Sequence, residues 1–326
     1  MGARVAIVGL GMAVTPHAKS LVDLGPRVQV AYAHSPSAER RKKFAERFAF
    51  PQCERLETIL EDRAVGAVLV LTPPNTHLEV VGRCAAAGKH VLLEKPLEVS
   101  TSRAEQLVRV CKDVKLGVVL QHRFRPAVER LRELLPSLGE LVSASAMIGN
   151  WRPQSYYDQP GRGSRARDGG GVLLTQGIHT LDVLLSLCGE VAEVKSFVTT
   201  TPVHRMETED LVTAALRFAH GALGVVHATT TAYPGFPERI ELIGTRGTAL
   251  LEGTSLRMQL HDEPPFEFKT DAGSGGTGAD PMAFPHDWHR CVLADFLDAI
   301  EQNRQPRVSG SEALKVHRFI DRLLAA

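Results

Sequence analysis

Three short stretches of this 326-residue chain combine residue types that could bind a ligand or move a proton. The first is a pair of glycines behind an apolar run, the second a pair of opposite charges before a proline, and the third a polar stripe in an apolar segment. Their residues are Gly9 and Gly11; Glu94 and Lys95; Thr175, His179 and Asp182. The corresponding chemistries are phosphate binding by backbone N–H groups, recognition of charge, and proton transfer by an imidazole.

The glycine pair fits the turn between a first strand and a first helix. Gly9 permits a tight turn after Val5–Val8, and Gly11 lets the pyrophosphate of a dinucleotide approach the N–H groups of the helix start. The third position of this fingerprint is Val14, where glycine or alanine is usual, so an ordinary turn with two glycines is the alternative. Its place at the head of an alternating strand–helix series favours dinucleotide binding.

The end of the second expected strand bears on the choice between NAD and NADP. An NAD site usually has a carboxylate here that accepts a hydrogen bond from the ribose 2′-hydroxyl, whereas this chain has His34 and Ser35. Either residue could bind a hydroxyl or a 2′-phosphate. Arg40 and Arg41 on the next helix could add positive charge or be solvated surface residues. Both cofactors stay open.

Two polar turns follow the next strands of the series. Thr72–His77 comes after one strand, and Glu94–Pro96 comes after the following one. Ligands of open α/β sheets bind at the carboxyl ends of the strands, so these turns are candidate contacts. A surface turn is the alternative for the Glu–Lys pair.

The polar stripe lies on one face of an expected helix. Thr175, His179 and Asp182 are spaced four and three apart in a segment otherwise rich in leucine, valine and isoleucine. Buried polar groups need partners, so a mutually satisfied structural pair and a functional pair are equal alternatives. The glycine run Gly169–Gly171 at the start would let a ligand or another backbone approach closely.

Composition excludes several classes of protein. The chain is 44% hydrophobic and 23% charged, with a formal net charge of +1, and so lacks a basic field for nucleic acid or anionic lipid. Five cysteines without a CxxC pair argue against a disulfide framework or a structural zinc site. The apolar runs are shorter than the roughly 18 residues that a membrane span needs, and the opening run is not typical of a secretory signal. We expect a cytoplasmic protein.

The elements that must position these residues form two blocks. Short apolar runs alternate with helical periodicity over the first 120 residues, which predicts an α/β fold with a doubly wound parallel sheet. From about 190 to 260 closely spaced alternating segments predict a mostly antiparallel sheet, and two helices close the chain. We expect domains at 1–122 and 123–326, with a flexible loop at Ala272–Asp280.

In their order along the chain these stretches resemble one family. Gly9–Gly11 with His17, Thr72–His77, Glu94–Pro96, Gln121–Phe124 and Gly169–Asp182 are similar to the glucose–fructose oxidoreductase, inositol dehydrogenase and rhizopine-catabolism (Gfo/Idh/MocA) oxidoreductases. The resemblance covers nearly the whole chain. It implies a Rossmann domain, then an α+β domain with an open antiparallel sheet, and a homodimer or homotetramer formed through one face of that sheet.

The resemblance also implies site residues. Lys95 and His179 correspond to the family's catalytic lysine and histidine, with Thr175 and Asp182 in support. The family usually has an aspartate four residues before the histidine, where this chain has Thr175. Asp182 could take part of that role, the histidine could act with a lower pKa, or the activity could be altered or lost.

Cofactor and substrate contacts complete the expected site. For NAD or NADP we expect Gly9, Gly11, Met12, Ala13, His34, Ser35, Thr72, Pro73, Asn75, His77, Glu94 and Lys95. The loop Trp151–Tyr157 resembles that of members acting on sugars and nucleotide-sugars. Expected substrate contacts are Arg123, Tyr156, Tyr157, Arg162 and Arg165, for each of which a surface or packing role is the alternative. No metal is expected, since His286, Asp287 and His289 lack an identifiable third ligand.

The implied reaction is hydride transfer between a nicotinamide and the secondary alcohol of a sugar, polyol or nucleotide-sugar. His179, with an ordinary histidine pKa near ~6.5, would accept the hydroxyl proton, and Lys95 would stabilise the developing alkoxide. Both are expected to converge on one cavity. An NAD-dependent glycosidase or lyase without net NADH release, and a catalytically weak nucleotide-binding regulator, are the alternative classes.

Overall fold

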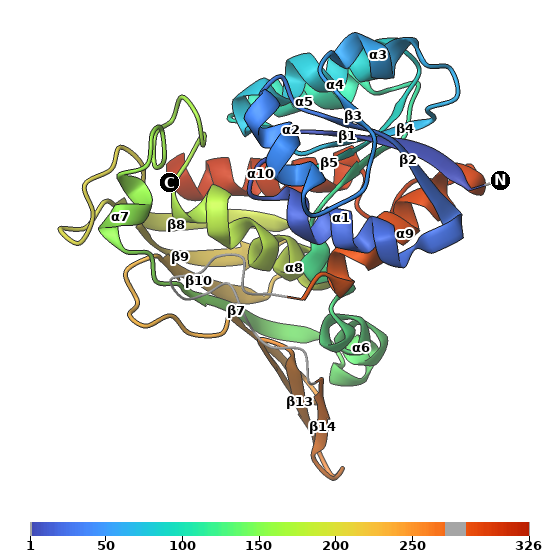
Figure 1. Ribbon diagram of the computed structural model, residues 1–326. Coiled ribbons are helices and arrows are strands. Elements are labelled where there is room, and N and C mark those ends of the chain that lie inside the picture. Colours follow the sequence, from blue (N-terminus) through green and yellow to red (C-terminus); the bar gives the residue numbers. More distant parts are fainter. Residues whose placement is uncertain (1, 271–284, 326) are drawn as a thin grey trace. The chain divides into compact units, whose positions relative to one another are not determined.

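The computed structural model describes residues 2–270 and 285–325 (Figure 1). By their internal contacts they form two compact units, Met1–Leu120 with His286–Leu314, and Gln121–Pro285 with Lys315–Ala326. The expected loop Ala272–Asp280 lies outside the described residues. Each unit is built on one sheet.

The first unit contains the predicted doubly wound parallel sheet. Its strands are β1 (Ala3–Val8), β2 (Val28–His34), β3 (Gln52–Cys53), β4 (Ala67–Val70), β5 (His90–Leu93) and β6 (Leu116–Val118). They lie in the order β3-β2-β1-β4-β5-β6, and every neighbouring pair is parallel. The strand order reverses beside β1, so the turns after β1 and β4 meet at the sheet edge where such folds bind nucleotides.

Helices cover this sheet. They are α1 (Val14–Asp23), α2 (Ala38–Ala45), α3 (Leu56–Glu61), α4 (His77–Ala86), α5 (Thr101–Val110) and α9 (Asp287–Glu301). Although α9 comes late in the chain, it packs against α1 in the first unit. Its Phe296 lies against β6, where a Cβ on Gly117 would come within 2.9 Å of the phenyl ring. The absence of a side chain at Gly117 is what admits α9.

The second unit contains the predicted mostly antiparallel sheet. Its strands are β7 (Leu141–Gly149), β8 (Val191–Thr199), β9 (Leu211–Phe218), β10 (Leu223–Thr229), β11 (Arg239–Gly244), β12 (Gly247–Glu252), β13 (Ser255–Leu260) and β14 (Phe266–Lys269). The order is β14-β13-β12-β11-β7-β10-β9-β8, and only the β7–β10 pair among these is parallel. The predicted fold class is confirmed.

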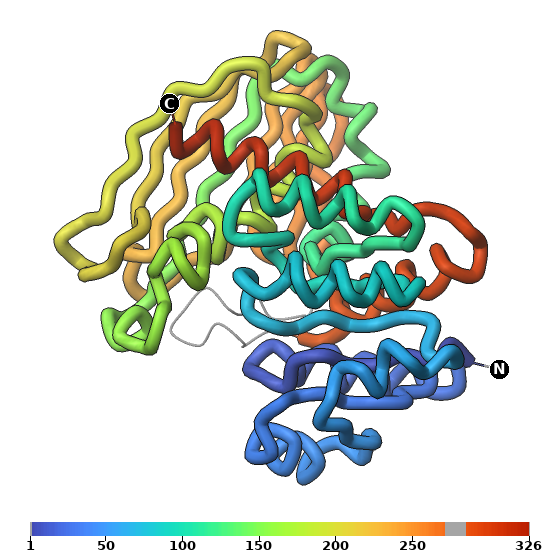
Figure 2. Tube along the Cα trace, turned by 90° about the horizontal axis from the view of Figure 1, so that it is seen from above, coloured from blue at the N-terminus to red at the C-terminus, as the bar shows by residue number. Residues whose placement is uncertain are grey.

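Helices lie against this sheet as well. They are α6 (Pro126–Leu134), the one-turn α7 (Gln154–Tyr157) and α8 (Ile178–Cys188), with α8 packed on β7. The final helix α10 (Gly310–Ala325) begins in the first unit and ends in the second. There its last turn lies beside β8 (Figure 2). Ser196 of β8 donates a hydrogen bond of 2.6 Å to the carbonyl of Leu323 in this turn.

Side chains on the sheet of the second unit alternate between a covered and an open face. On β7, Ala144, Ala146 and Ile148 are buried, whereas Ser145 is partly exposed and Met147 is exposed. The open face continues onto other strands through further apolar side chains. These are Phe197, Leu223, Val225 and Ile243, with Phe197 87% exposed.

Candidate active site

The turn after β1 has the geometry expected of a dinucleotide site. Gly9 has a φ of +107°, and a Cβ there would lie 2.7 Å from the carbonyl carbon of Leu71. A Cβ on Gly11 would meet nothing within 4 Å, so its surface is open. No side chain caps α1 at Ala13, and Met12 is 51% exposed. These residues fit a phosphate group that reaches the backbone N–H groups at the start of α1.

Val14, the departure from the glycine fingerprint, is buried at the start of α1. The helix therefore accommodates the larger side chain in its apolar face. This position does not block the open surface at Gly11.

The end of β2 is polar but uncharged. His34 is buried with Nδ1 3.3 Å from the carbonyl oxygen of Cys53, and burial lowers its pKa, so the ring is neutral at pH 7. Arg41 donates to the carbonyl of Ser35 at 2.6 Å and pairs with Glu54 at 3.4 Å. The charge of Arg41 is thus engaged within the unit, while Arg40 is exposed.

His77 links the two polar turns after β4 and β5. Its Nε2 lies 2.8 Å from the carbonyl oxygen of Thr72, and its Nδ1 lies 3.0 Å from that of Pro96. The ring is fully buried, and burial lowers its pKa. Pro73 and Asn75 stay exposed in the same turn. His77 therefore joins the two turns through its ring nitrogens, whereas Pro73 and Asn75 face solvent.

Lys95 is held through its backbone. Its N–H donates to Glu94 Oε2 at 3.1 Å, and Glu94 Oε1 lies 2.7 Å from Nε2 of His17. Glu94 and Lys95 are both only partly exposed. The carboxylate at this turn is thus committed to two hydrogen bonds.

The glycine run Gly169–Gly171 before α8 lets another segment of backbone pack closely against it. The N–H of Gly171 donates to Glu209 Oε2 at 3.0 Å, and the N–H of Leu173 donates to Oε1 at 3.2 Å. A Cβ on Gly171 would lie 1.8 Å from the carbonyl oxygen of Glu209. Burial raises the pKa of Glu209 above its ordinary value. The segment that packs closely against these glycines is the backbone at Glu209. The sequence left a ligand and another backbone as the two possibilities, and the structure has the backbone.

The helix that carries the polar stripe opens with a π-helical turn at Leu173–Gly177. Thr175 lies in this turn and donates to the carbonyl of Gly171 at 2.6 Å, with its hydroxyl also bonded to the Gln176 side chain. A π-turn widens the helical repeat, so Thr175 is offset from the regular α-helical spacing expected for it. Such turns are frequent at functional sites.

Asp182 belongs to a buried ion pair. Arg123 donates to both of its carboxylate oxygens, through Nε at 2.7 Å and through an Nη at 2.6 Å. Asp182 is 1% exposed. Arg123, an expected substrate contact, thus makes a two-pronged contact with Asp182. The partner of Asp182 is therefore Arg123, which lies outside the stripe.

His179 stacks on His122, which belongs to the Gln121–Phe124 stretch of the resemblance but has no role in the site expected from the sequence. The rings of His122 and His179 lie 4.5 Å apart at an interplanar angle of 27°. His122 Nε2 lies 2.6 Å from an Nη of Arg125. Because guanidinium only donates, this nitrogen of His122 is an acceptor and its ring is neutral. The Gln121–Phe124 motif and the three-residue spacing of His122 and Arg125 are sequence signals for this arrangement.

The expected substrate loop separates into packed and accessible parts. Tyr157 is buried and donates to Thr230 Oγ1 at 3.0 Å, and burial raises its pKa to about 12. The Arg162 guanidinium lies 5.1 Å from the ring centre of Tyr156. Arg165 is exposed, and its backbone N–H donates to Glu207 at 3.0 Å. Tyr156 and Arg162 are therefore the residues of this set that combine an aromatic face with a nearby cation.

Comparisons with known proteins agree with these features. Residues 3–122 match a family model described as an oxidoreductase family with an NAD-binding Rossmann fold, and residues 128–250 match the GFO/IDH/MocA C-terminal domain. Myo-inositol 2-dehydrogenase of Thermotoga maritima is 30% identical over 95% of this chain and 91% of its own length. The scyllo-inositol 2-dehydrogenase (NAD(+)) of Bacillus subtilis is 27% identical over 76% of this chain and 73% of its own.

Two solved structures share the fold. Levoglucosan dehydrogenase, in complex with NADH and levoglucosan, has a TM-score of 0.87 at 21% identity, covering 99% of this chain and 96% of that one. The WlbA dehydrogenase from Bordetella pertussis, in complex with NADH and UDP-GlcNAcA, has a TM-score of 0.84 at 24% identity, with coverage of 99% and 96%.

The fold, the glycine turn and these matches define an NAD-binding oxidoreductase. The chain belongs to the GFO/IDH/MocA family, and the predicted resemblance is confirmed. Among the described residues, no helix is long and apolar enough to cross a membrane.

Proposed function

We propose that this protein oxidises or reduces a secondary alcohol of a polyol, sugar or sugar derivative, with His179 as its proton acceptor or donor. The observation that carries the proposal is the stacked His179 ring, fixed at the start of α8 by a neutral imidazole. Relatives that match over most of the chain are inositol dehydrogenases, which supports a polyol substrate. A histidine whose ring plane is fixed can exchange a proton with one hydroxyl in a defined direction.

The first unit would hold the cofactor. Gly9, Gly11, Met12 and Ala13 would surround its phosphates, and His34 with Ser35 would meet the ribose. When bound, the nicotinamide supplies the hydride donor or acceptor. A neutral His34 and an engaged Arg41 offer little to a 2′-phosphate, which favours NAD over NADP.

Lys95 and His179 would divide the work on the substrate oxygen. The imidazole takes the hydroxyl proton as the C–H bond breaks, and returns it in the reverse direction. The Lys95 ammonium donates a hydrogen bond to the oxygen and stabilises its negative charge. Tyr156 and Arg162 would contact the remaining hydroxyls of the substrate.

A substrate panel tests this proposal. Myo-inositol, scyllo-inositol, levoglucosan and a nucleotide-sugar would each be incubated with NAD+ and with NADP+, and formation of reduced nicotinamide followed by absorbance. We expect turnover of at least one polyol or sugar and a lower KM for NAD+ than for NADP+. Glycoside cleavage without net NADH formation would support the lyase or glycosidase alternative, and NADH binding without any turnover would support a regulator.

The open sheet face of the second unit also supports a homo-oligomer. Exposed apolar side chains of this face, such as Met147, Leu223 and Val225, favour burial against a second copy. Analytical ultracentrifugation should give a dimer or tetramer, and Val225→Glu with Met147→Glu should yield monomer. The free cysteines of the described residues suit a reducing, cytoplasmic setting.

A further inference from the structure

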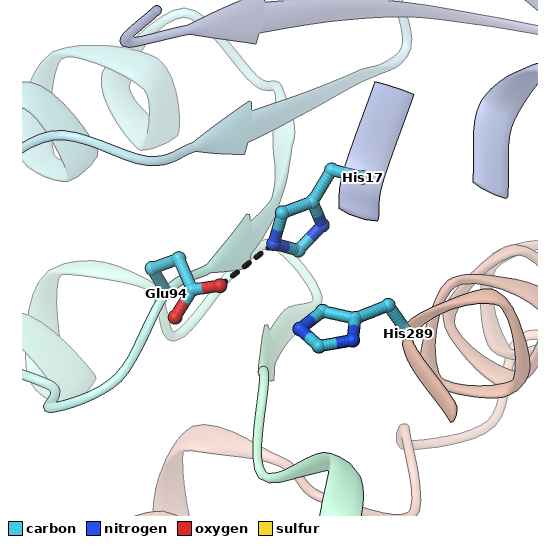
Figure 3. A group of neighbouring side chains, drawn as sticks. All are labelled: His17, Glu94 and His289. Atoms are coloured by element: carbon cyan, nitrogen blue, oxygen red, sulfur yellow. Dashed lines mark hydrogen bonds and ion pairs between the residues drawn. The ribbon is translucent and has the colours of Figure 1, made fainter. Parts of the chain in front are cut away.

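Three ionisable side chains of the first unit lie close together at the Glu94–Pro96 turn. His17 comes from α1, Glu94 from the end of β5 and His289 from α9 (Figure 3). The two imidazole rings lie 5.0 Å apart at an angle of 89°. The side chains of His17 and Glu94 are 1% and 13% exposed, and His289 is 3% exposed. The two imidazoles are therefore buried, and the carboxylate keeps only a small exposed area.

Within the cluster the carboxylate has two separate partners. Its Oε1 lies 2.7 Å from His17 Nε2, and its Oε2 accepts the backbone N–H of Lys95 at 3.1 Å. A carboxylate can only accept, so Nε2 of His17 is the donor. Glu94 thus joins α1 to the backbone of the residue expected to touch the substrate.

The charges in the cluster favour this arrangement. Burial alone would raise the pKa of Glu94, but the His17 hydrogen bond and the nearby positive charge of Lys95 bring it below its usual value. Burial lowers the pKa of His289 to about 3, with His17, His286 and Lys95 acting in the same direction and Glu94 opposing them. At pH 7 the cluster holds an ionised carboxylate beside a neutral His289 ring.

We propose that His17 is a positioning residue for Lys95, holding the Glu94 carboxylate so that its second oxygen fixes the Lys95 backbone N–H. His289 closes the cluster as a neutral ring and keeps water from the carboxylate. A charged acceptor in a dry environment holds its donors more strongly than the same group in water. The inference rests on the proposed catalytic role of Lys95 for its kinetic readout.

A bound metal is the competing explanation for the same three residues. Their ligand atoms all lie within 4.8 Å of one another, whereas tetrahedral zinc ligands lie about 3.4 Å apart at zinc–ligand distances near 2.1 Å. Metal binding would replace the His17–Glu94 hydrogen bond. The 2.7 Å separation in the structure is that of the hydrogen bond, which favours positioning.

The test compares two substitutions of His17 with a control on the same helix. His17→Leu removes the donor, and His17→Gln restores an N–H near the Nε2 position. Ser20→Ala is the control, because Ser20 is buried on α1 and bonds to the carbonyls of Pro16 and His286 without contacting Glu94. Each protein would be assayed for kcat and KM with its best polyol and NAD+, for NADH affinity, and for hydrogen exchange at the Lys95 amide.

Loss of the donor should act on Lys95 and spare the cofactor. In His17→Leu we expect kcat to fall about tenfold and exchange at the Lys95 amide to rise about tenfold, with NADH affinity within about threefold of wild type. Burial should then raise the Glu94 pKa, so the acidic limb of kcat in this variant should extend to higher pH than the wild-type limb set by His179. His17→Gln should restore kcat, exchange and the wild-type pH profile, and Ser20→Ala should keep all three.

Other outcomes would overturn the proposal. Unchanged Lys95 exchange in His17→Leu, or the same changes in Ser20→Ala, would mean that His17 serves general packing. One equivalent of zinc in the purified protein, with activity lost on chelation, would assign the cluster to a metal. The exchange measurement needs no substrate, so failure of this inference is distinguishable from failure of the proposed function, which would appear as no turnover in the wild type.

Discussion

The two expected catalytic residues, Lys95 and His179, are held in place in different ways. Lys95 in the first unit is held by its backbone, through the Glu94 carboxylate on one side and the carbonyl–histidine contacts of His77 on the other. His179 in the second unit is held by its ring, through the stack on His122. The long side chain of a lysine is flexible, so a fixed backbone limits the positions that its ammonium can reach. A general base instead needs a ring whose plane and direction are fixed.

The difference extends to how each unit handles buried charge. In the first unit a carboxylate lies directly beside Lys95. In the second unit the buried carboxylate on the catalytic helix is Asp182, which Arg123 binds with two hydrogen bonds. Thr175 stands where an acidic residue was expected and bonds to the helix backbone. A buried carboxylate thus lies beside the expected catalytic lysine in one unit, and in the other it joins α8 to Arg123.

Breaking the buried ion pair should give the largest effect on stability. Asp182→Ala leaves the Arg123 guanidinium buried without its carboxylate, and we expect a loss of about 3–5 kcal/mol in the free energy of unfolding of the second unit. Urea unfolding followed by tryptophan fluorescence measures it. Arg123→Met combined with Asp182→Leu should recover much of this loss, and a single variant as stable as wild type would show that the pair is dispensable.

Removing the Lys95 ammonium should separate turnover from binding. Lys95→Met keeps the stem of the side chain, and we expect kcat to fall by about 10²–10³ as for other lost donors to a developing oxyanion. NADH affinity, measured by fluorescence titration, should change far less. A variant that lost NADH affinity and kept kcat would make Lys95 a cofactor residue.

The cluster behind Lys95 should make the first unit acid-sensitive. His289 has a folded-state pKa of about 3, well below its unfolded value, so the unfolded chain binds a proton first as the pH falls. Stability from this residue is present above the unfolded value near 6.5 and falls by up to about 1.4 kcal/mol per pH unit below it. His289→Phe should flatten this slope in unfolding titrations between pH 6.5 and 4, and an unchanged slope would contradict burial of a neutral ring.

The stack in the second unit should give the smallest effect. His122→Leu keeps packing but removes the flat partner of His179 and the acceptor of Arg125. We expect kcat to fall about fivefold, in line with an aromatic contact of roughly 1 kcal/mol, with KM for NAD+ unchanged. His122→Phe should recover part of the loss, because the aromatic face returns. Equal activity of the wild type, His122→Leu and His122→Phe would show that His122 does not orient His179.

Local patterns in the sequence predict the frame of both units. Alternating apolar runs predict the parallel sheet, and the close spacing of later strands predicts the antiparallel one. The shortest elements escape such patterns, and β3 is an example because two residues carry no periodicity. The π-turn at Leu173–Gly177 was also missed, since nothing in its apolar sequence distinguishes it from an α-helical turn.

The partners of the site residues are harder to predict than the residues themselves. Glycines, the Glu–Lys turn and the polar stripe stand out by type and spacing. Their partners lie far along the chain, with His17 77 positions from Glu94 and Arg123 59 positions from Asp182. His289 stood out in the sequence through its neighbours on α9, but its companions His17 and Glu94 reach it only through folding. Long-range pairing depends on the whole fold.

The central claim is that the imidazole of His179 carries the substrate proton. The most direct test is the pH dependence of kcat for His179→Ala beside the wild type, on the best polyol of the panel, with NADH affinity measured in parallel. The account predicts a fall in kcat of ~10²–10⁴ with loss of the wild-type acidic limb and unchanged NADH affinity. A variant that turns over at the wild-type rate with the same pH profile would contradict it.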